Sequence, residues 1–175
     1  MIELLDPVFI NFLIRIFGRE SIHNVVDPTK ISLKTYLVPI DIIKPHEGFY
    51  NNLVSEVLEQ IISWGYLKYP IIVDSRTMIV LDGHHRLEAL KRLGLKYIPV
   101  FFIDYAESYV DLYPIRKEIP VSKIDVVKKV YVENSIYPPK TTRHFYIGIS
   151  ILPSYIPLKH LINENLSYLP ILRDF

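Results

Sequence analysis

The chain of 175 residues contains no cysteine, and this absence excludes disulfide bonds, thiolate metal sites and cysteine nucleophiles. Half of its residues are hydrophobic, yet no apolar run approaches the ~20 residues that span a bilayer. Asp6 and Arg15 interrupt the first apolar segment, which also lacks a basic leader and a small-residue cleavage site. We therefore expect a folded amphipathic helix there instead of a signal peptide, no membrane segment, and a cytoplasmic protein.

The sequence also lacks a strong excess of charge of either sign, because 20 basic and 19 acidic residues give a formal net charge of +1. A duplex-binding domain more often carries a basic excess on one face, so the charge balance weighs against nucleic acid as the partner. The chain is rich in proline, tyrosine, isoleucine and lysine, a composition that favours a thermophilic source.

Hydrophobic periodicity and turn residues predict an α+β fold, with a small mixed β-sheet flanked by helices. Helices are expected over 7–17, from 51 or 52 to about 64, over 83–93 and over 120–132. Strands are expected over 36–40, 70–74, 78–81, 98–103 and near 145–151. Asp6 would cap the first helix and Asn51 or Asn52 the second.

The expected domain organisation is an N-terminal helix and link over residues 1–30 and a domain over 31–175, compact as a whole. The strand at 98–103 would be central in the sheet. The first helix is apolar enough to pack on the domain or on a second copy of the chain, and the sequence leaves the oligomeric state open.

The most informative stretch is the junction between an apolar run and an amphipathic helix, Asp82-Gly83-His84-His85-Arg86. Backbone N–H groups at a helix start have no partners within the helix, and the helix dipole makes that end positive. Gly83 lets a ligand approach the main chain, and Arg86 can bind two phosphate oxygens at once. The pattern predicts a phosphate-binding turn. The alternative is a plain helix N-cap formed by Asp82, with solvated histidines.

Two further polar clusters lie beside apolar structure. One is Lys44-Pro45-His46-Glu47, and the other is Pro138-Pro139-Lys140-Thr141-Thr142-Arg143-His144. Taken singly, Glu47 could be an exposed turn residue and the second cluster an ordinary loop. Taken together, a phosphate-binding turn, a loop carboxylate and a basic, hydroxyl-bearing loop are the groups that phosphoryl transfer uses.

These residues also carry a resemblance. The chain resembles the ParB/sulfiredoxin-like superfamily in the hairpin of the strands expected over 70–74 and 78–81, in the Asp82–Arg86 turn, and in the later Leu93-Gly94 and Ile98-Pro99-Val100. The three clusters in this order are similar, more narrowly, to archaeal free L-serine kinases, over roughly residues 37–161. The resemblance implies transfer of a phosphoryl group from ATP or ADP to free L-serine, which gives O-phospho-L-serine for cysteine biosynthesis.

The resemblance places the nucleotide at the turn after Asp82. The N–H groups of Gly83 and His84, with the side chains of His85 and Arg86, would hold the phosphates. Asp82 would position Mg²⁺ or its waters, because hard divalent cations prefer carboxylate oxygen.

The remaining roles fall to the other two clusters. Glu47, carried over from the His-Glu loop of the kinases, would accept the proton of the serine hydroxyl, with His46 orienting it or contacting phosphate. The loop of Thr142, Arg143 and His144 would recognise the amino acid, since the guanidinium of Arg143 suits a carboxylate.

The sequence departs from its relatives in three places. Sulfiredoxins need a cysteine near the position of His84, so their activity is ruled out. Chromosome-partition relatives usually carry Gly-Glu-Arg-Arg, where this chain has Gly-His-His-Arg. The connection 104–120 is abbreviated compared with the kinases.

The alternatives are a ParB-like nucleotide-binding or nuclease module that acts on nucleic acid, a binding protein without chemistry, and a kinase for another small hydroxyl compound.

Overall fold

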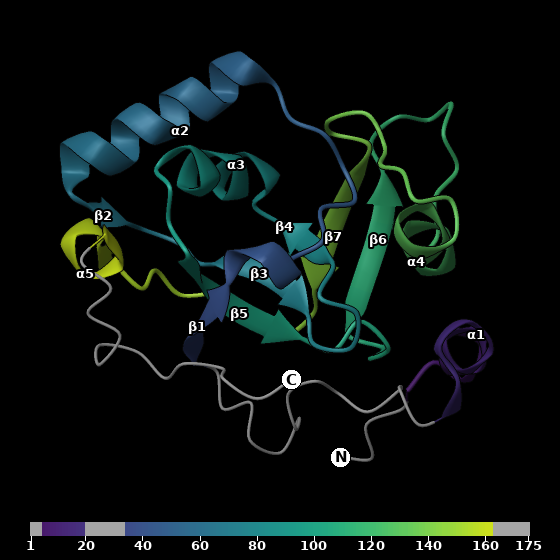
Figure 1. Cartoon of the computed structure of the whole chain (residues 1–175). Helices are drawn as coiled ribbons and strands as arrows, with labels where there is room; N and C mark the ends of the chain where they lie inside the picture. Colours follow the sequence, from purple (N-terminus) through teal and green to yellow (C-terminus); the bar gives the residue numbers. More distant parts are fainter. Residues whose placement is uncertain (1–4, 20–33, 163–175) are drawn as a thin grey trace.

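The computed structural model describes residues 5–19 and 34–162 (Figure 1). Its central sheet has the strand order β1 (Thr35–Pro39), β5 (Tyr97–Ile103), β3 (Ile71–Asp74) and β4 (Val80–Asp82). Strand β5 runs antiparallel to β1 and parallel to β3, and β3 runs antiparallel to β4. The α+β class, the mixed sheet and the central place of the predicted strand 98–103 are therefore confirmed.

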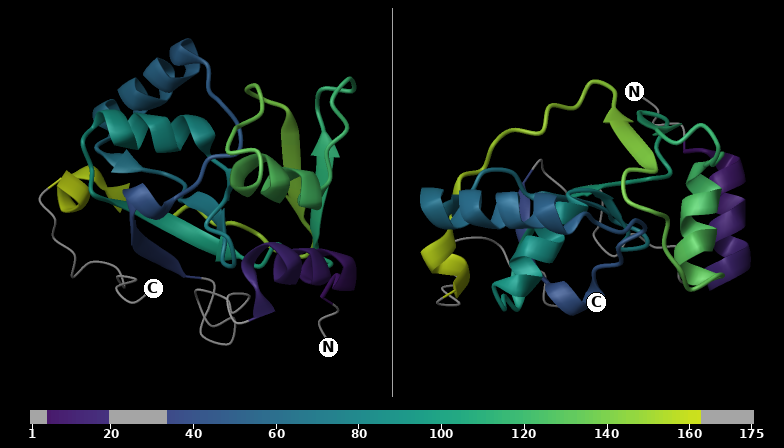
Figure 2. Two further views of the ribbon diagram at one scale, coloured as in Figure 1. Left: turned by 45° about the vertical axis from the view of Figure 1, so that its right-hand side comes forward. Right: turned by 90° about the horizontal axis from the view of Figure 1, so that it is seen from above.

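Helices pack on both faces of the sheet because side chains alternate between the faces of a strand. One face carries α2 (Asn51–Trp64) and α3 (His84–Arg92), and the other carries α1 (Pro7–Phe17) and α4 (Lys123–Tyr131) (Figures 1 and 2). Along β5, Val100 and Phe102 are buried in the cluster with α2 and α3, whereas Phe101 and Ile103 are buried with α1 and α4. The two clusters fix the strand ends from which the site is built.

The first helix packs on the domain, the first of the two options that the sequence left open. The side chain of Asp6 accepts hydrogen bonds from two first-turn amides at 2.9 and 3.2 Å, so the predicted N-cap is confirmed. Its own backbone amide donates to the carbonyl of Ala106 at 2.8 Å. Phe9 is buried edge-on against Tyr105, with 5.5 Å between ring centroids. The predicted link continues over residues 20–30, which lie outside the described ranges.

Short elements complete the described fold: η2 (Ile40–Ile42), β2 (Tyr66–Leu67) with β8 (Ile156–Pro157), β6 (Val110–Pro114) with β7 (Thr142–Tyr146), and α5 (Leu158–Ile162). The β6–β7 ribbon lies beside β4 (Figure 1). None of the helices within the described ranges is long and apolar enough to cross a bilayer.

The ribbon corrects two sequence-based predictions. The cluster around Thr142, expected as a loop, forms strand β7, and the strand predicted near 145–151 is wrong beyond Tyr146. The connection 104–120, for which no strand was expected, contains β6, the partner of β7. Both strands owe their formation to pairing between residues 28 to 36 positions apart, a non-local interaction that local propensity does not reveal.

The cap of the second helix is also corrected. Asn51 is the first helical residue, and Tyr50 occupies the cap position without a side-chain hydrogen bond. The side chain of Asn51 instead accepts a hydrogen bond from Arg92 of α3 at 2.7 Å. It therefore ties the two helices of that face together.

Asp74, at the end of β3, anchors the turn into β4. Its buried carboxylate accepts hydrogen bonds from the backbone amides of Arg76, Thr77 and Tyr105 at 3.3, 3.0 and 2.9 Å, and from the Thr77 hydroxyl at 2.5 Å. Beside it, the Arg76 guanidinium donates two hydrogen bonds of 2.7 Å to Asp104. These contacts join the β3–β4 turn to the end of β5.

Asp74 is expected to make stability depend on pH. Burial raises its pKa to about 6, even though its hydrogen bonds favour the ionised form. A raised pKa means that the native state binds the proton more tightly than the unfolded state does. The contribution of Asp74 to the free energy of unfolding is therefore full below about pH 4 and is lost as pH rises through about 6. Asp74→Asn should lower the free energy of unfolding by about 1–3 kcal/mol, because an amide NH₂ would face backbone donors.

Urea unfolding at several pH values between 4 and 7 measures this effect. The difference between the parent and Asp74→Asn should shrink as pH rises over that range, while the exposed Asp41→Asn should show no such trend. A difference that stays constant with pH would contradict the assignment.

Candidate functional site

Backbone pairing holds the loop that carries Glu47. The segment 44–48 runs beside the main chain on two sides. On one side, the amide of Lys44 donates to the carbonyl of Met78 at 2.9 Å. On the other side, the carbonyl of His46 accepts from the amide of Tyr137 at 2.8 Å, and the amide of Gly48 donates to the carbonyl of Tyr137 at 2.9 Å. Glu47 therefore lies on a short extended segment between two others and is not an exposed turn residue.

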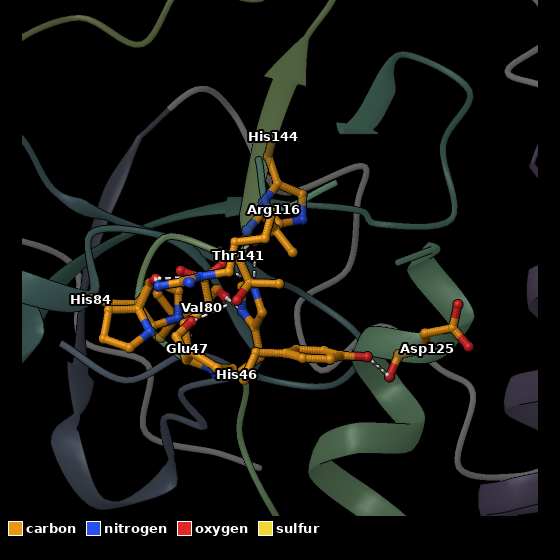
Figure 3. A network of polar contacts seen from close by, with 12 residues as sticks. His46, Glu47, Val80, His84, Arg116, Asp125, Thr141 and His144 are labelled. Atoms are coloured by element: carbon orange, nitrogen blue, oxygen red, sulfur yellow. Dashed lines mark hydrogen bonds and ion pairs between the residues drawn. The ribbon is translucent and has the colours of Figure 1, made fainter. Parts of the chain in front are cut away.

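Figure 3 shows the side chain of Glu47 beside that of His46. The Glu47 carboxylate is buried, with 7% of the residue exposed. Its Oε1 atom accepts hydrogen bonds from the backbone amide of Thr142, at 2.5 Å, and from the Thr142 hydroxyl. The Nε2 atom of His46 lies 3.6 Å from the same oxygen. Burial alone would raise the pKa of Glu47, but the interactions with His46 and Thr142 outweigh it and lower the pKa. The carboxylate is therefore ionised at neutral pH.

His46 lies behind this carboxylate and is fully buried. Its Nδ1 atom is 2.5 Å from the carbonyl oxygen of Val80, and its Nε2 atom is 2.8 Å from the hydroxyl oxygen of Thr142. The described residues that line the adjoining cavity include Glu47 but not His46. Of the two expected roles, this position suits orientation of Glu47 and not contact with phosphate.

Helix α3 begins without a side-chain cap. Gly83 occupies the cap position with φ 102° and ψ 29°, and no side chain caps the first turn. The expected cap, Asp82, is the last residue of β4, where its largely exposed carboxylate pairs with Arg86 at 2.8 Å. With φ at 102°, a conformation that other residues rarely adopt, glycine is needed here for its backbone freedom, and a Cβ atom would lie 2.9 Å from the guanidinium of Arg86. The first-turn amides of α3 remain available to an anion.

The two histidines of the motif are held in place, contrary to the solvated alternative. His84 Nε2 accepts a hydrogen bond of 3.4 Å from the amide of His46, and the rings meet edge to face at 4.6 Å. His85 Nε2 accepts a hydrogen bond of 3.1 Å from the amide of Tyr50 and stacks on its ring. Burial lowers the pKa of both histidines, so both are neutral at pH 7.

Strand β7 divides the predicted substrate loop between two faces. Thr142 and His144 point inward, whereas Arg143 is exposed on the outer face. His144 Nε2 lies 2.9 Å from the hydroxyl of Tyr105, and burial lowers the pKa of His144. Arg143 lines both the main cavity and a second one on the outer face of the ribbon. The three residues therefore do not act as one recognition loop.

One cavity of about 680 Å³ brings the three predicted clusters together. From these clusters its walls include Glu47, Asp82, Gly83, His84, His85, Arg86, Thr142, Arg143 and His144. Lys140 and Tyr146 also line it, and sequence reasoning gave them no role. Lys140 was visible as a cation in the third cluster, and Tyr146 follows from the two-residue period once β7 is known to be a strand.

The carboxylates of the cavity can hold a magnesium ion only together with the phosphates of a bound ligand. Within the described ranges, no cluster of three or more histidine, aspartate or glutamate side chains is arranged to hold a metal ion. Mg²⁺ is commonly held by one or two carboxylates together with substrate phosphates and water. Asp82, at the cavity wall, can supply one such carboxylate.

No family profile matches the chain. Over 80 residues it is 38% identical to an ATP-dependent L-serine kinase from Staphylothermus marinus, a match that covers 43% of this chain and 32% of that protein. Over 70 residues it is 41% identical to a ParB-like protein from Sulfolobus acidocaldarius, covering 40% of this chain and 35% of that protein. The matches thus span about a third of the length of these curated relatives.

The fold comparison covers more of the chain. The solved structure of a free serine kinase in complex with AMP superposes with a TM-score of 0.66 at 15% identity, over 74% of this chain and 94% of that one. The chain thus has the fold of a free serine kinase, and part of it is similar in sequence to an L-serine kinase and to a ParB-like protein.

Proposed function

We propose that this protein is a small-molecule kinase that transfers a phosphoryl group from ATP or ADP to the hydroxyl of free L-serine. The observation that carries the proposal is the joint position of Glu47 and the uncapped start of α3 on one cavity. An ionised, held carboxylate and a cluster of free amides are the base and the anion site that this reaction requires. The similarity to proteins named L-serine kinases supports the choice of acceptor.

The phosphates would bind at the start of α3. The first-turn amides carry the positive end of the helix dipole, and the Arg86 guanidinium lies directly under Gly83. Lys140 lines the same cavity and adds a second cation. Asp82 would release part of its pairing with Arg86 to hold Mg²⁺ that is bound to the phosphates. The metal would neutralise charge on the phosphoryl group as it is transferred.

Glu47 would act on the acceptor. The serine oxygen attacks the terminal phosphorus, its proton passes to Glu47, and the bond from phosphorus to the bridging oxygen of the leaving nucleotide breaks. The products are O-phospho-L-serine and the nucleotide shortened by one phosphate. Arg143, at the cavity wall, would pair with the serine carboxylate. Positioning and charge neutralisation supply most of the rate in such transfers.

Glu47→Gln should abolish most turnover and leave nucleotide affinity almost unchanged. The amide keeps the shape of the side chain but cannot accept the proton, and a general base contributes about 10²–10⁴-fold. The measurement is phosphoserine formation from L-serine with Mg²⁺ and either ATP or ADP, beside calorimetric titration of the nucleotide. Glu118→Gln, which changes an exposed carboxylate, is the matched control and should retain full activity. Full activity in Glu47→Gln would remove Glu47 from the base role.

Arg86→Ala should instead weaken nucleotide binding by about 10–100-fold, because hydrogen bonds to charged groups contribute about 1.5–3 kcal/mol. Arg92→Ala provides the comparison, since Arg92 lies on the same helix but pairs with Glu88 and does not line the cavity described above. Titration of ADP into both variants measures the effect. Equal affinities would show that the phosphates bind elsewhere.

The similarity to a ParB-like protein favours one alternative, a nucleotide-binding or nuclease module that acts on nucleic acid. Contacts to a phosphate backbone release counterions, so binding to DNA would weaken steeply with salt. Salt-dependent DNA binding or nicking without phosphoserine formation would favour this alternative over the kinase.

A further inference from the structure

The hydrogen bonds around Glu47 define where the protons lie. Glu47 is ionised, so Oε1 only accepts, and both the amide and the hydroxyl of Thr142 donate to it. The single hydroxyl proton is then used, so His46 Nε2, at 2.8 Å, must donate to the Thr142 oxygen. The other ring nitrogen of His46 faces the carbonyl of Val80, which can only accept. Thr142 therefore relays a hydrogen bond from the His46 ring to the Glu47 carboxylate.

The result is a buried chain of hydrogen bonds, from the His46 ring through the Thr142 hydroxyl to the Glu47 carboxylate. A carboxylate taken out of water needs compensating hydrogen bonds, and Thr142 provides two of them on one oxygen. Within the described residues, the hydrogen bonds and ion pair of Glu47 all converge on Oε1. Oε2 is left as the oxygen for a proton from outside the protein.

We propose that Thr142 is a positioning residue, which fixes Oε1 of Glu47 so that Oε2 meets the acceptor hydroxyl, and that it does not contact the amino acid. The inference rests on the proposed kinase function and replaces the substrate-binding role that the sequence pattern suggested for Thr142. The hydroxyl proton and the amide proton of Thr142 both go to Glu47, so neither donor is available to a substrate.

Other charged groups face the same cavity. Besides His46, the titratable and charged side chains on the cavity with Glu47 are Asp82, His84, His85, Arg86, Lys140, Arg143, His144 and Tyr146. A change of pH affects them all, so the test compares variants that differ only at the hydroxyl.

Thr142→Val removes the hydroxyl and keeps the backbone donor and the shape, whereas Thr142→Ser keeps the hydroxyl. With saturating nucleotide, Thr142→Val should lower kcat by about 10–100-fold. The loss is smaller than the about 10²–10⁴-fold that a general base contributes, because Glu47 is still present but is less well positioned. The KM for L-serine should change less than about twofold. Thr142→Ser should restore most of the rate.

The matched control is Thr141→Val, because Thr141 is also buried but its hydroxyl donates to the carbonyl of Pro138 at 2.7 Å. This variant should keep kcat and KM. A raised KM with unchanged kcat in Thr142→Val, or equal losses in Thr142→Val and Thr142→Ser, would overturn the proposal.

The pH profile gives a readout that a merely structural role would not move. Loss of a donor to the carboxylate raises the pKa of Glu47, so the acid limb of kcat against pH should shift to higher pH in Thr142→Val. It should not shift in Thr142→Ser.

Carbon-13 NMR titration of the glutamate carboxyls in the ligand-free chain, with Glu47→Gln to assign the signal, measures the same shift without any reaction. An unchanged titration of Glu47 in folded Thr142→Val refutes the positioning role, whatever the activity. A shifted titration in a protein that does not form phosphoserine refutes the kinase function and leaves the positioning of Glu47 intact.

Discussion

The geometry of the site depends on backbone hydrogen bonds that hold residues 44–48 between the edge of the sheet and the segment at Tyr137. These bonds carry Glu47 into a position that is almost closed to solvent, where an uncompensated carboxylate would be unfavourable. Two donors from Thr142 and the neighbouring His46 offset that desolvation. Because β7 supplies Thr142, the β6–β7 ribbon must be paired before the carboxylate can be held.

The same arrangement separates two opposite electrostatic requirements. At the start of α3 the chain offers amides, a cation and a glycine that keeps the backbone open, all suited to an anion. The same cavity also contains an anion of the protein itself, Glu47, which would repel phosphate if it were exposed at the start of α3. His84, the first residue of α3, is kept neutral by burial and accepts a hydrogen bond from the main chain of His46. In the proposed reaction, this separation would let the cavity bind the phosphates while Glu47 keeps its role as the base.

The sequence was sufficient for the features that depend on local interactions. Asp6 and Gly83 each stand at a helix start where their own chemistry favours that position, and the apolar strand 98–103 is central because it is hydrophobic on both faces. The cavity that joins the three clusters was anticipated from their residue types.

The non-local features could not be read in this way. Whether Thr142 faces Glu47 or a substrate depends on the pairing of β7 with β6, and that register is set by tertiary contacts. Asp82 matched the preferences of a helix cap, yet it ends a strand and pairs with Arg86 because Gly83 turns the chain first. Lys140 lines the cavity and has a backbone φ of 55°, a conformation that its sequence context does not specify.

The decisive experiment is a crystal structure with ADP, Mg²⁺ and L-serine bound. We expect the terminal phosphate on the amides that open α3 and the serine hydroxyl within hydrogen-bonding distance of Glu47 Oε2. Phosphates bound away from that helix start, or a Glu47 carboxylate turned from the hydroxyl, would contradict this expectation.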